Sequence, residues 1–195
     1  MDTKKYLHEK FNRKSDQIPP VRCKRFKRKS LAETFGRLGF RKGAEIGVAG
    51  GYYSLELCNY IPNLELLCID PWERYAENPR GQVNQEGMYN RTKEVLAPYN
   101  VKLIKAMSMD AVRDVPMESL DFVYIDGHHG FDYVIQDLVE WSKRVKKGGI
   151  ISGHDYYRFR LAGVVDAVDA YIKAHQINEW FICDEREPSF FWVKP

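Results

Sequence analysis

The chain has 195 residues, of which 44% are hydrophobic and 29% charged, a composition typical of one globular domain with a substantial core. No run of 18 apolar residues occurs, which excludes a membrane-spanning helix, and the charged opening MDTKKYLHEKFNRK lacks the apolar centre of a secretory signal. The four cysteines show no CxxC spacing, so we expect buried, reduced thiols in a cytoplasmic protein.

Charge is distributed unevenly along the chain. Residues 1–30 carry eleven Lys and Arg against three acids, whereas the remainder carries nineteen basic and twenty-four acidic residues. We therefore expect residues 1–39 to form a basic arm or helical extension, and residues 40–195 to form the main domain. Such an arm can attract nucleic acid, lipid head groups or phosphorylated glycans, or it can be a plain solvated helix or frayed end.

Beyond residue 40, short apolar segments alternate with amphipathic segments of helical period. The pattern predicts strands at 43–48, 64–70, 101–106, 120–126 and 150–155. It predicts helices at 52–61, at 91–99, from 131 to the glycines at 148 and 149, and at 161–175. The polar segment 73–90 contains Pro79, Gly81 and Gly87 and is expected to be a long loop or lid. Residues 179–195 predict a hairpin around Pro188.

Strands that alternate with helices are typical of α/β proteins, in which right-handed crossovers build a Rossmann-like, doubly wound sheet. We expect about seven strands, mostly parallel with the last strand antiparallel, and helices on both faces. Ligands of such sheets bind beyond the carboxyl ends of the strands. Residues that directly follow a strand are therefore the candidates for a functional site.

A glycine-rich turn follows the first predicted strand, with the sequence EIGVAGG over residues 45–51. Glycines let the backbone turn sharply and approach a ligand, and the next helix offers free N–H groups. The second strand ends at Asp70, twenty-five residues after Glu45, where a carboxylate can accept both hydroxyls of a ribose. These features predict a cofactor that contains a nucleoside.

The same turn departs from the fingerprint of dinucleotide-binding proteins. Its spacing is G-x-x-G-G in place of G-x-G-x-x-G, and Glu45 lies two residues before the first glycine. A carboxylate at that position would repel a pyrophosphate but would suit a cationic sulfonium or ammonium group. The turn therefore favours S-adenosylmethionine (SAM).

Five segments together resemble successive motifs of class I SAM-dependent methyltransferases: AEIGVAGGYYS, LLCIDPW, DFVYIDGHHGFDYVIQDL, GGIISGHDY and GVVDAVDAYI. The subgroup that they resemble comprises small-molecule O-methyltransferases related to the macrocin and cephamycin tailoring enzymes. The resemblance covers residues 40–195 and is most specific around Asp126 and His154. The fold that it implies, a seven-stranded sheet with an antiparallel last strand, agrees with the pattern described above.

The positions of these motifs imply two sets of contacts with SAM, one to its amino acid part and one to its nucleoside. Contacts to the amino acid part are implied for Glu45, Gly47, Gly51 and Ser54. Contacts to the nucleoside are implied for Asp70 at the ribose and for Pro71, Trp72, Met109 and Asp110 at the adenine, with Asp126 reaching the cofactor from the fourth strand. Trp72 can instead be core, Ser54 a helix-surface hydroxyl, and Asp110 a helix cap.

The resemblance also implies candidate metal ligands, which are Asp126, His154 and Asp155. Metal-dependent relatives place an Asp at the first position and a carboxylate pair at the other two, and bind Mg²⁺ through oxygen. Because Mg²⁺ prefers oxygen ligands, the histidine leaves Mg²⁺, a transition metal and no metal as alternatives. Zinc bound by three histidines is a fourth alternative, but the usual ligand spacings are absent.

Two histidines follow Asp126 in the sequence DGHH. Imidazole titrates near neutral pH, which suits a general base, and in the resembled family the residue two positions after the strand-end acid takes that role. We therefore expect His128 and Asp126 to be catalytic, with Asp126 holding a metal or stabilising the imidazolium. His129 is expected to cap the following helix or to pack beneath the loop.

The leading hypothesis is a SAM-dependent methyltransferase that acts on an oxygen of a small molecule or glycan. A nucleic-acid (RNA) methyltransferase that uses the basic arm is the alternative. The Asn/Asp-Pro-Pro-aromatic motif of amino-methylating nucleic-acid enzymes does not follow the fourth strand, which counts against it. A non-catalytic SAM-binding module is a third hypothesis, and the cluster of acid and imidazole argues against it.

Overall fold

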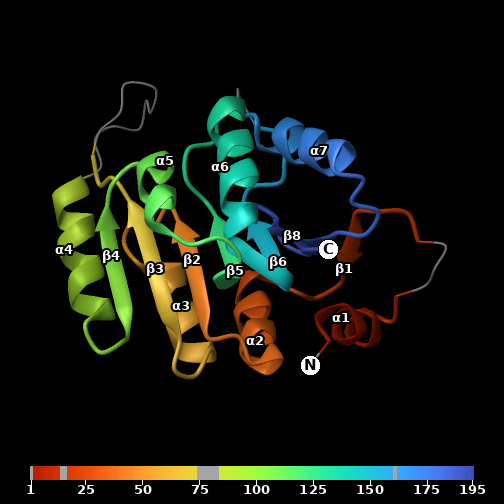
Figure 1. Ribbon diagram of the computed structural model, residues 1–195, viewed down its shortest axis with the longest axis horizontal. Coiled ribbons are helices and arrows are strands. Elements are labelled where there is room, and N and C mark those ends of the chain that lie inside the picture. The colour runs from red at the N-terminus through yellow and green to blue at the C-terminus, as the bar shows by residue number, and fades with distance from the viewer. Residues whose placement is uncertain (1, 14–16, 74–83, 160–161) are drawn as a thin grey trace.

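Eight strands form one mixed sheet (Figure 1). The computed structural model describes residues 2–13, 17–73, 84–159 and 162–195. The strand order is β1-β7-β8-β6-β5-β2-β3-β4; β8 runs antiparallel to both neighbours and all other pairs are parallel. In chain order the strands are Val21–Cys23 (β1), Lys42–Ile46 (β2), Glu65–Asp70 (β3), Val101–Lys105 (β4), Leu120–Ile125 (β5), Val145–Gly153 (β6), Phe181–Cys183 (β7) and Phe190–Val193 (β8).

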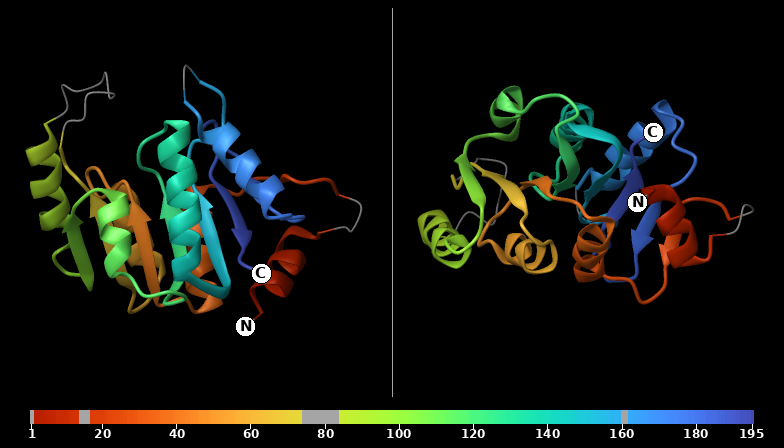
Figure 2. Two further views of the ribbon diagram at one scale, coloured as in Figure 1. Left: turned by 45° about the horizontal axis from the view of Figure 1, so that its top comes forward. Right: turned by 60° about the horizontal axis from the view of Figure 1, so that its bottom comes forward.

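Helices cover both faces of this sheet (Figure 2). One face carries α1 (Thr3–Phe11), α2 (Arg28–Leu38), α3 (Tyr52–Tyr60) and α4 (Gln85–Leu96). The other face carries α5 (Ser108–Ala111), the short 3-10 helix Val112–Asp114, α6 (Phe131–Arg144) and α7 (Val164–Ala174). Each face has its own apolar core, with Leu57 fully buried in the first and Trp141 in the second. Two covered faces explain why the sequence LDFVYI of β5 is apolar except at Asp121.

The predicted fold class is confirmed. The seven expected strands are β2 to β8, and the terminal hairpin is present as antiparallel β7 and β8, with β8 lying between β6 and β7. The eighth strand, β1, comes from the basic N-terminal segment and pairs in parallel with β7, with Val21 opposite Phe181. A three-residue strand is too short to leave a periodic pattern in the sequence.

Two predicted boundaries differ most from the structure. The segment 73–90 was expected to be a loop or lid, but α4 begins at Gln85, because the Asn84 side chain caps it by accepting the Gly87 N–H at 2.9 Å. Residues 74–83 of that segment lie outside the described residues. The next long helix, expected to continue to residue 148, ends at Arg144, because Val145 is fully buried in β6 opposite Leu120.

The described part of residues 2–38 packs against the sheet. Leu7 of α1 and Leu31 of α2 are fully buried, and the Phe11 ring lies 5.0 Å from Phe26 and 5.4 Å from Phe181. Burying a large apolar side chain contributes about 1.5–3 kcal/mol to stability. The domain boundary expected at residue 39 stays a prediction, but the basic segment shares its core with the sheet.

All four cysteines are buried and free. Burial raises the pKa of the Cys23 and Cys58 thiols to about 12, so both behave as small apolar groups.

No helix in the described part of the chain is long and apolar enough to cross a membrane.

Candidate functional site

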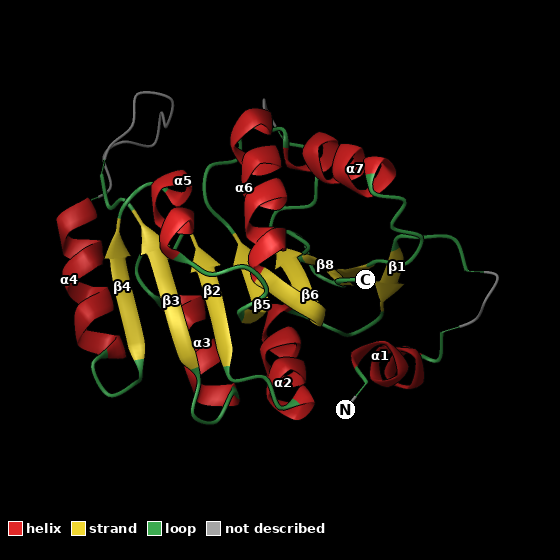
Figure 3. Cartoon of the chain, viewed as in Figure 1, coloured by secondary structure: helices red, strands yellow, loops and turns green. Residues whose placement is uncertain are grey.

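The residues singled out by sequence lie along one edge of the sheet. Strands β2, β3, β5 and β6 are parallel, so their carboxyl ends point the same way (Figure 3). The glycine-rich turn follows β2, Asp70 ends β3, Asp126 follows β5, and His154 follows β6. This edge is where open α/β sheets bind ligands.

The turn after β2 requires glycine at two positions. Gly47 has φ +86°, and a Cβ placed there would lie 2.1 Å from the carbonyl oxygen of Asp126. Gly51 has φ +74° and is the N-cap of α3. Side chains are disfavoured in this left-handed region, and the close approach to Asp126 leaves no room for one at Gly47. The turn therefore depends on the neighbouring strand end as well as on its own sequence.

Asp70 holds this turn in place. Its Oδ2 accepts the N–H groups of Val48 and Ala49 at 3.0 and 2.9 Å, and its Oδ1 accepts that of Trp72 at 2.6 Å. A carboxylate has about four lone-pair directions, so these bonds leave one on Oδ1 for a ribose hydroxyl. The arrangement leaves room for Asp70 to accept one ribose hydroxyl, and the expected contact with both hydroxyls stays a prediction.

The residues predicted to contact the adenine lie at the ends of β3 and β4. Trp72 is 3% exposed, its Nε1 donates to the Ala49 carbonyl at 2.8 Å, and its ring lies 4.8 Å from Tyr89. It thus braces the turn as a core residue, which was the alternative given above. Pro71 is half-buried, and Met109 and Asp110 lie on α5 after β4. Asp110 does not cap α5, whose N-cap is Met107.

Glu45 and Ser54 lie beneath the turn, inside the core. Both are buried, and the Ser54 hydroxyl donates to the Glu45 carboxylate. Burial raises the pKa of Glu45 to about 8, although the Ser54 hydrogen bond and the Arg28 charge oppose the shift. The predicted contacts of Glu45 and Ser54 with the amino acid part of SAM stay predictions, since neither side chain lies on the surface of the site in this structure.

The acid and imidazole groups gather around the ends of β5 and β6. His129 Nε2 lies 2.9 Å from Asp155 Oδ2 and 3.9 Å from Asp126 Oδ1. His154 Nδ1 lies 3.1 Å from Asp155 Oδ1 and 3.8 Å from Asp126 Oδ1. Asp126 and Asp155 raise the pKa of His129 to about 9. Burial alone would raise the pKa of Asp155, but the bonds from His129 and His154 outweigh it and hold that pKa well below its usual range.

The two adjacent histidines differ from their expected positions. His128 Nδ1 accepts the Gly130 N–H at 2.9 Å at the start of α6, and its ring lies 4.0 Å from Tyr133. The expectation that His129 caps this helix or packs beneath the loop is therefore wrong: His128 bonds the helix start, and His129 joins the acid cluster. A neutral imidazole has one lone pair, which in His128 is engaged by Gly130. The catalytic role expected for His128 stays a prediction.

Arg28 is the site residue that the sequence did not reveal. Its guanidinium Nη2 lies 2.7 Å from Asp126 Oδ2, although the two residues are far apart in the chain. In sequence it was only one of eleven cations in the basic segment. No local pattern distinguishes it from its neighbours.

The expected metal ligands come together. One ligand atom each of Asp126, His154 and Asp155 lies within 4.8 Å of the others. Arg28 already neutralises Asp126, however, and His129 and His154 contact Asp155. The donor types suit a divalent ion, but their present partners do not leave the carboxylates free for one. The arrangement therefore does not fit a bound divalent metal.

A second buried acid lies behind the cluster. Asp137 of α6 is 5% exposed and accepts the Ser108 hydroxyl, which in turn accepts the Trp141 Nε1–H at 2.7 Å. Burial raises the pKa of Asp137 to about 7, and the Ser108 hydrogen bond opposes the shift. The sequence signal was an acid directly before Leu138 on the apolar stripe of α6.

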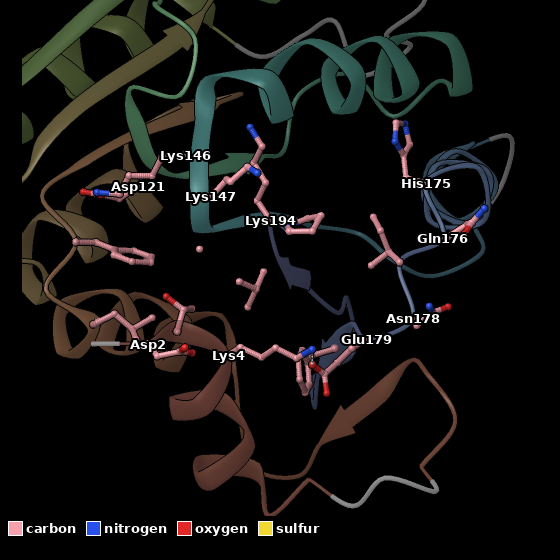
Figure 4. Close-up of a pocket in the computed structure, with 18 of the residues that line it drawn as sticks. Asp2, Lys4, Asp121, Lys146, Lys147, His175, Gln176, Asn178, Glu179 and Lys194 are labelled. Carbon is pink, nitrogen blue, oxygen red and sulfur yellow. Dashed lines mark ion pairs between the residues drawn. The ribbon is translucent and has the colours of Figure 1, made fainter.

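A large cavity lies at the opposite end of the sheet (Figure 4). It measures about 850 Å³ and is lined by Asp2, Lys4, Asp121, Lys146 and Glu179 among others. Its lysines are largely neutralised, since Lys146 pairs with Asp121 and Lys4 with Glu179. None of the residues predicted for the site lines this cavity.

Solved methyltransferases share this fold. An O-methyltransferase from Bacillus cereus in complex with S-adenosylhomocysteine (SAH) gives a TM-score of 0.64 at 15% identity, with 99% of this chain and 90% of that chain covered. Precorrin-6y C5,15-methyltransferase from Geobacter metallireducens gives 0.59 at 17% identity, with 84% and 87% covered. A proposed rRNA methylase from Clostridium thermocellum gives 0.64 at 14% identity, with 87% and 98% covered. At such low sequence identity, these similarities show a shared fold and do not identify the methyl acceptor.

The sequence matches the model of a methyltransferase domain family over residues 44–156. This match spans more than half of the chain, and the chain belongs to that family. A relative from Acanthamoeba polyphaga mimivirus, uncharacterized protein R132, is 30% identical over 161 residues, with 77% of this chain and 67% of the relative covered. Placement within the macrocin and cephamycin subgroup stays a prediction.

Proposed function

We propose that the protein is a SAM-dependent methyltransferase that transfers the methyl group to an oxygen of a small molecule or glycan. The proposal rests on one observation. The turn held by Asp70 lies at the same edge of the sheet as the cluster of Asp126, His129 and Asp155. Membership of the methyltransferase family supports the reaction class. The cluster supports an oxygen acceptor, because a hydroxyl needs a base to remove its proton.

When bound, SAM supplies an electrophilic methyl carbon on a positively charged sulfur. Asp70 would orient the nucleoside, and the cluster would receive the proton of the acceptor. An imidazole that donates from one nitrogen to a carboxylate is held in one orientation and can accept a proton at the other. His129 has this arrangement through Asp155, at 2.9 Å, and because its pKa is raised to about 9 the ring must first lose its second proton before it can act as a base. The contacts therefore favour His129 as the base over His128, whose Nδ1 is engaged by Gly130.

Calorimetric titration with SAH tests the cofactor assignment. We expect stoichiometric binding of SAH and no binding of NADH. Tight binding of NADH without SAH would overturn the assignment. Transfer of a labelled methyl group from SAM to hydroxylated sugars and phenols then tests the acceptor class.

RNA is the second candidate acceptor. The observation that favours it is the exposed basic run of Lys24, Arg25 and Lys27, which directly precedes the site residue Arg28. Such side chains contact phosphates without reading sequence. Label incorporated into RNA but not into sugars or phenols would favour this alternative. SAH binding without transfer to any acceptor would favour a non-catalytic module.

A further inference from the structure

Arg28 links the N-terminal segment to the acceptor side of the site. It is the first residue of α2 and precedes the family match, which begins at residue 44. Its guanidinium nevertheless reaches Asp126, with 2.7 Å between Nη2 and Oδ2. The side chains of the pair are only 26% and 17% exposed, so solvent and salt screen the interaction weakly.

Further contacts fix the guanidinium in place. It lies over the rings of Tyr53 and Tyr124, at 4.1 and 4.8 Å from their centroids, and both tyrosines are buried. The backbone N–H of Arg28 donates to the Glu185 carboxylate at 3.1 Å. A guanidinium stacks well on aromatic faces and does not lose its proton in proteins. Arg28 is therefore a permanent positive charge at a fixed position.

The carboxylates of the cluster already face donors. Asp126 presents Oδ2 to Arg28 and Oδ1 to the His129 and His154 rings, at 3.9 and 3.8 Å. The two oxygens of Asp155 lie 2.9 and 3.1 Å from the same two rings. A divalent ion held by Asp126 and Asp155 would have to displace these groups. It would also lie close beside the guanidinium, where like charges repel each other.

We propose that Arg28 takes the place of a divalent cation on Asp126, so that the acceptor side excludes metal and uses a fixed guanidinium instead. Arg28 acts as a positioning residue that holds the Asp126 carboxylate in its orientation beside His129. Its charge also favours an acceptor oxygen that is losing its proton to the imidazole. The inference rests on the proposed methyl transfer, but exclusion of metal is a binding property that can be measured without turnover.

Binding of Mn²⁺ to the full chain, followed by electron paramagnetic resonance, tests this proposal. We expect no stoichiometric binding by the unaltered chain. Arg28→Met keeps an extended side chain but removes the charge, and should raise the affinity for Mn²⁺ at least about tenfold. Arg28→Lys keeps the charge and should continue to exclude the ion. Adding Asp126→Asn to Arg28→Met should abolish the new site.

One Mn²⁺ bound by the unaltered chain and lost in Asp126→Asn would overturn the proposal. An unchanged Mn²⁺ affinity in a folded Arg28→Met protein would also overturn it. Circular dichroism reports the folding of each variant, and if Arg28→Met does not fold, Arg28→Gln takes its place in the same comparison. Titration of the same samples with SAH tests the proposed function separately. If SAH does not bind, the Mn²⁺ affinities can still be interpreted.

Discussion

The two halves of the site edge are built in different ways. On the cofactor side, one carboxylate, Asp70, holds backbone N–H groups of a turn that lies only about twenty residues away in sequence. On the acceptor side, charged side chains from separate elements meet, with Arg28 from α2, Asp126 and His129 from the segment after β5, and Asp155 from the segment after β6. The first half is local and rests on the backbone, whereas the second is long-range and ionic. Substitutions should therefore affect cofactor binding in the first half and turnover in the second.

The largest effect is expected from the two histidines of the acceptor side. His129→Gln should lower kcat by about 10²–10⁴, because it removes the proton acceptor that Asp155 orients. His128→Gln should lower kcat less than about tenfold, because Gln can still accept the Gly130 N–H at the start of α6. Steady-state kinetics with the acceptor found in the screen measures both variants.

SAH titration is the control for this pair, since both variants should bind SAH as the unaltered chain does. The opposite order of the two kcat values would restore His128 as the base. Near-normal kcat in both variants would show that neither imidazole takes the proton.

A substitution on the cofactor side should change the affinity for SAH. Asp70→Asn keeps the size of the side chain but removes the charge from the bonds to Val48, Ala49 and the ribose. Charge-assisted hydrogen bonds contribute about 1.5–3 kcal/mol, so we expect Kd for SAH to rise by about 10–150-fold. Calorimetry with SAH checks this value, and kcat at saturating SAM should change little. An unchanged Kd would show that Asp70 serves only the turn.

The same contrast explains what the sequence could predict. The hydrophobic pattern and the glycine turn were sufficient to predict strands β2 to β8 and the positions of Asp70 and Asp126, because these features are local or follow from strand order. Arg28 was not predictable, because its contact with Asp126 depends on how α2 packs on the sheet. The assignment of the two histidines depended on which ring turns towards Asp155, and that is decided by the local backbone after β5 rather than by residue type.

Glu45 provides a test by pH. Because burial raises its pKa in the folded state to about 8, the folded chain holds a proton that the unfolded chain has released. This contribution to stability is fully present below the unfolded pKa and is lost as pH rises, by up to about 1.4 kcal/mol per unit between about pH 5 and 8. Glu45→Gln should flatten this part of the stability curve. Urea unfolding of both proteins at several pH values measures the difference, and parallel curves would contradict it.

The smallest effect concerns the basic run beside the acceptor side. Deletion of residues 1–30 would be a poor test of acceptor recruitment, because it also removes Arg28, strand β1 and the buried Leu7. Lys24, Arg25 and Lys27 are exposed, so replacing all three with Gln removes charge without removing core.

If these side chains attract an anionic acceptor, the triple variant should raise KM by about two- to fivefold with kcat unchanged, and the difference should shrink at high salt. The matched control replaces three exposed lysines on β4, α6 and β6, namely Lys102, Lys143 and Lys147, with Gln. The control removes the same charge from other parts of the chain, so an equal rise of KM would point to net charge alone. Identical kinetics of the triple variant and the unaltered chain at low salt would mean that the basic run does not recruit the acceptor.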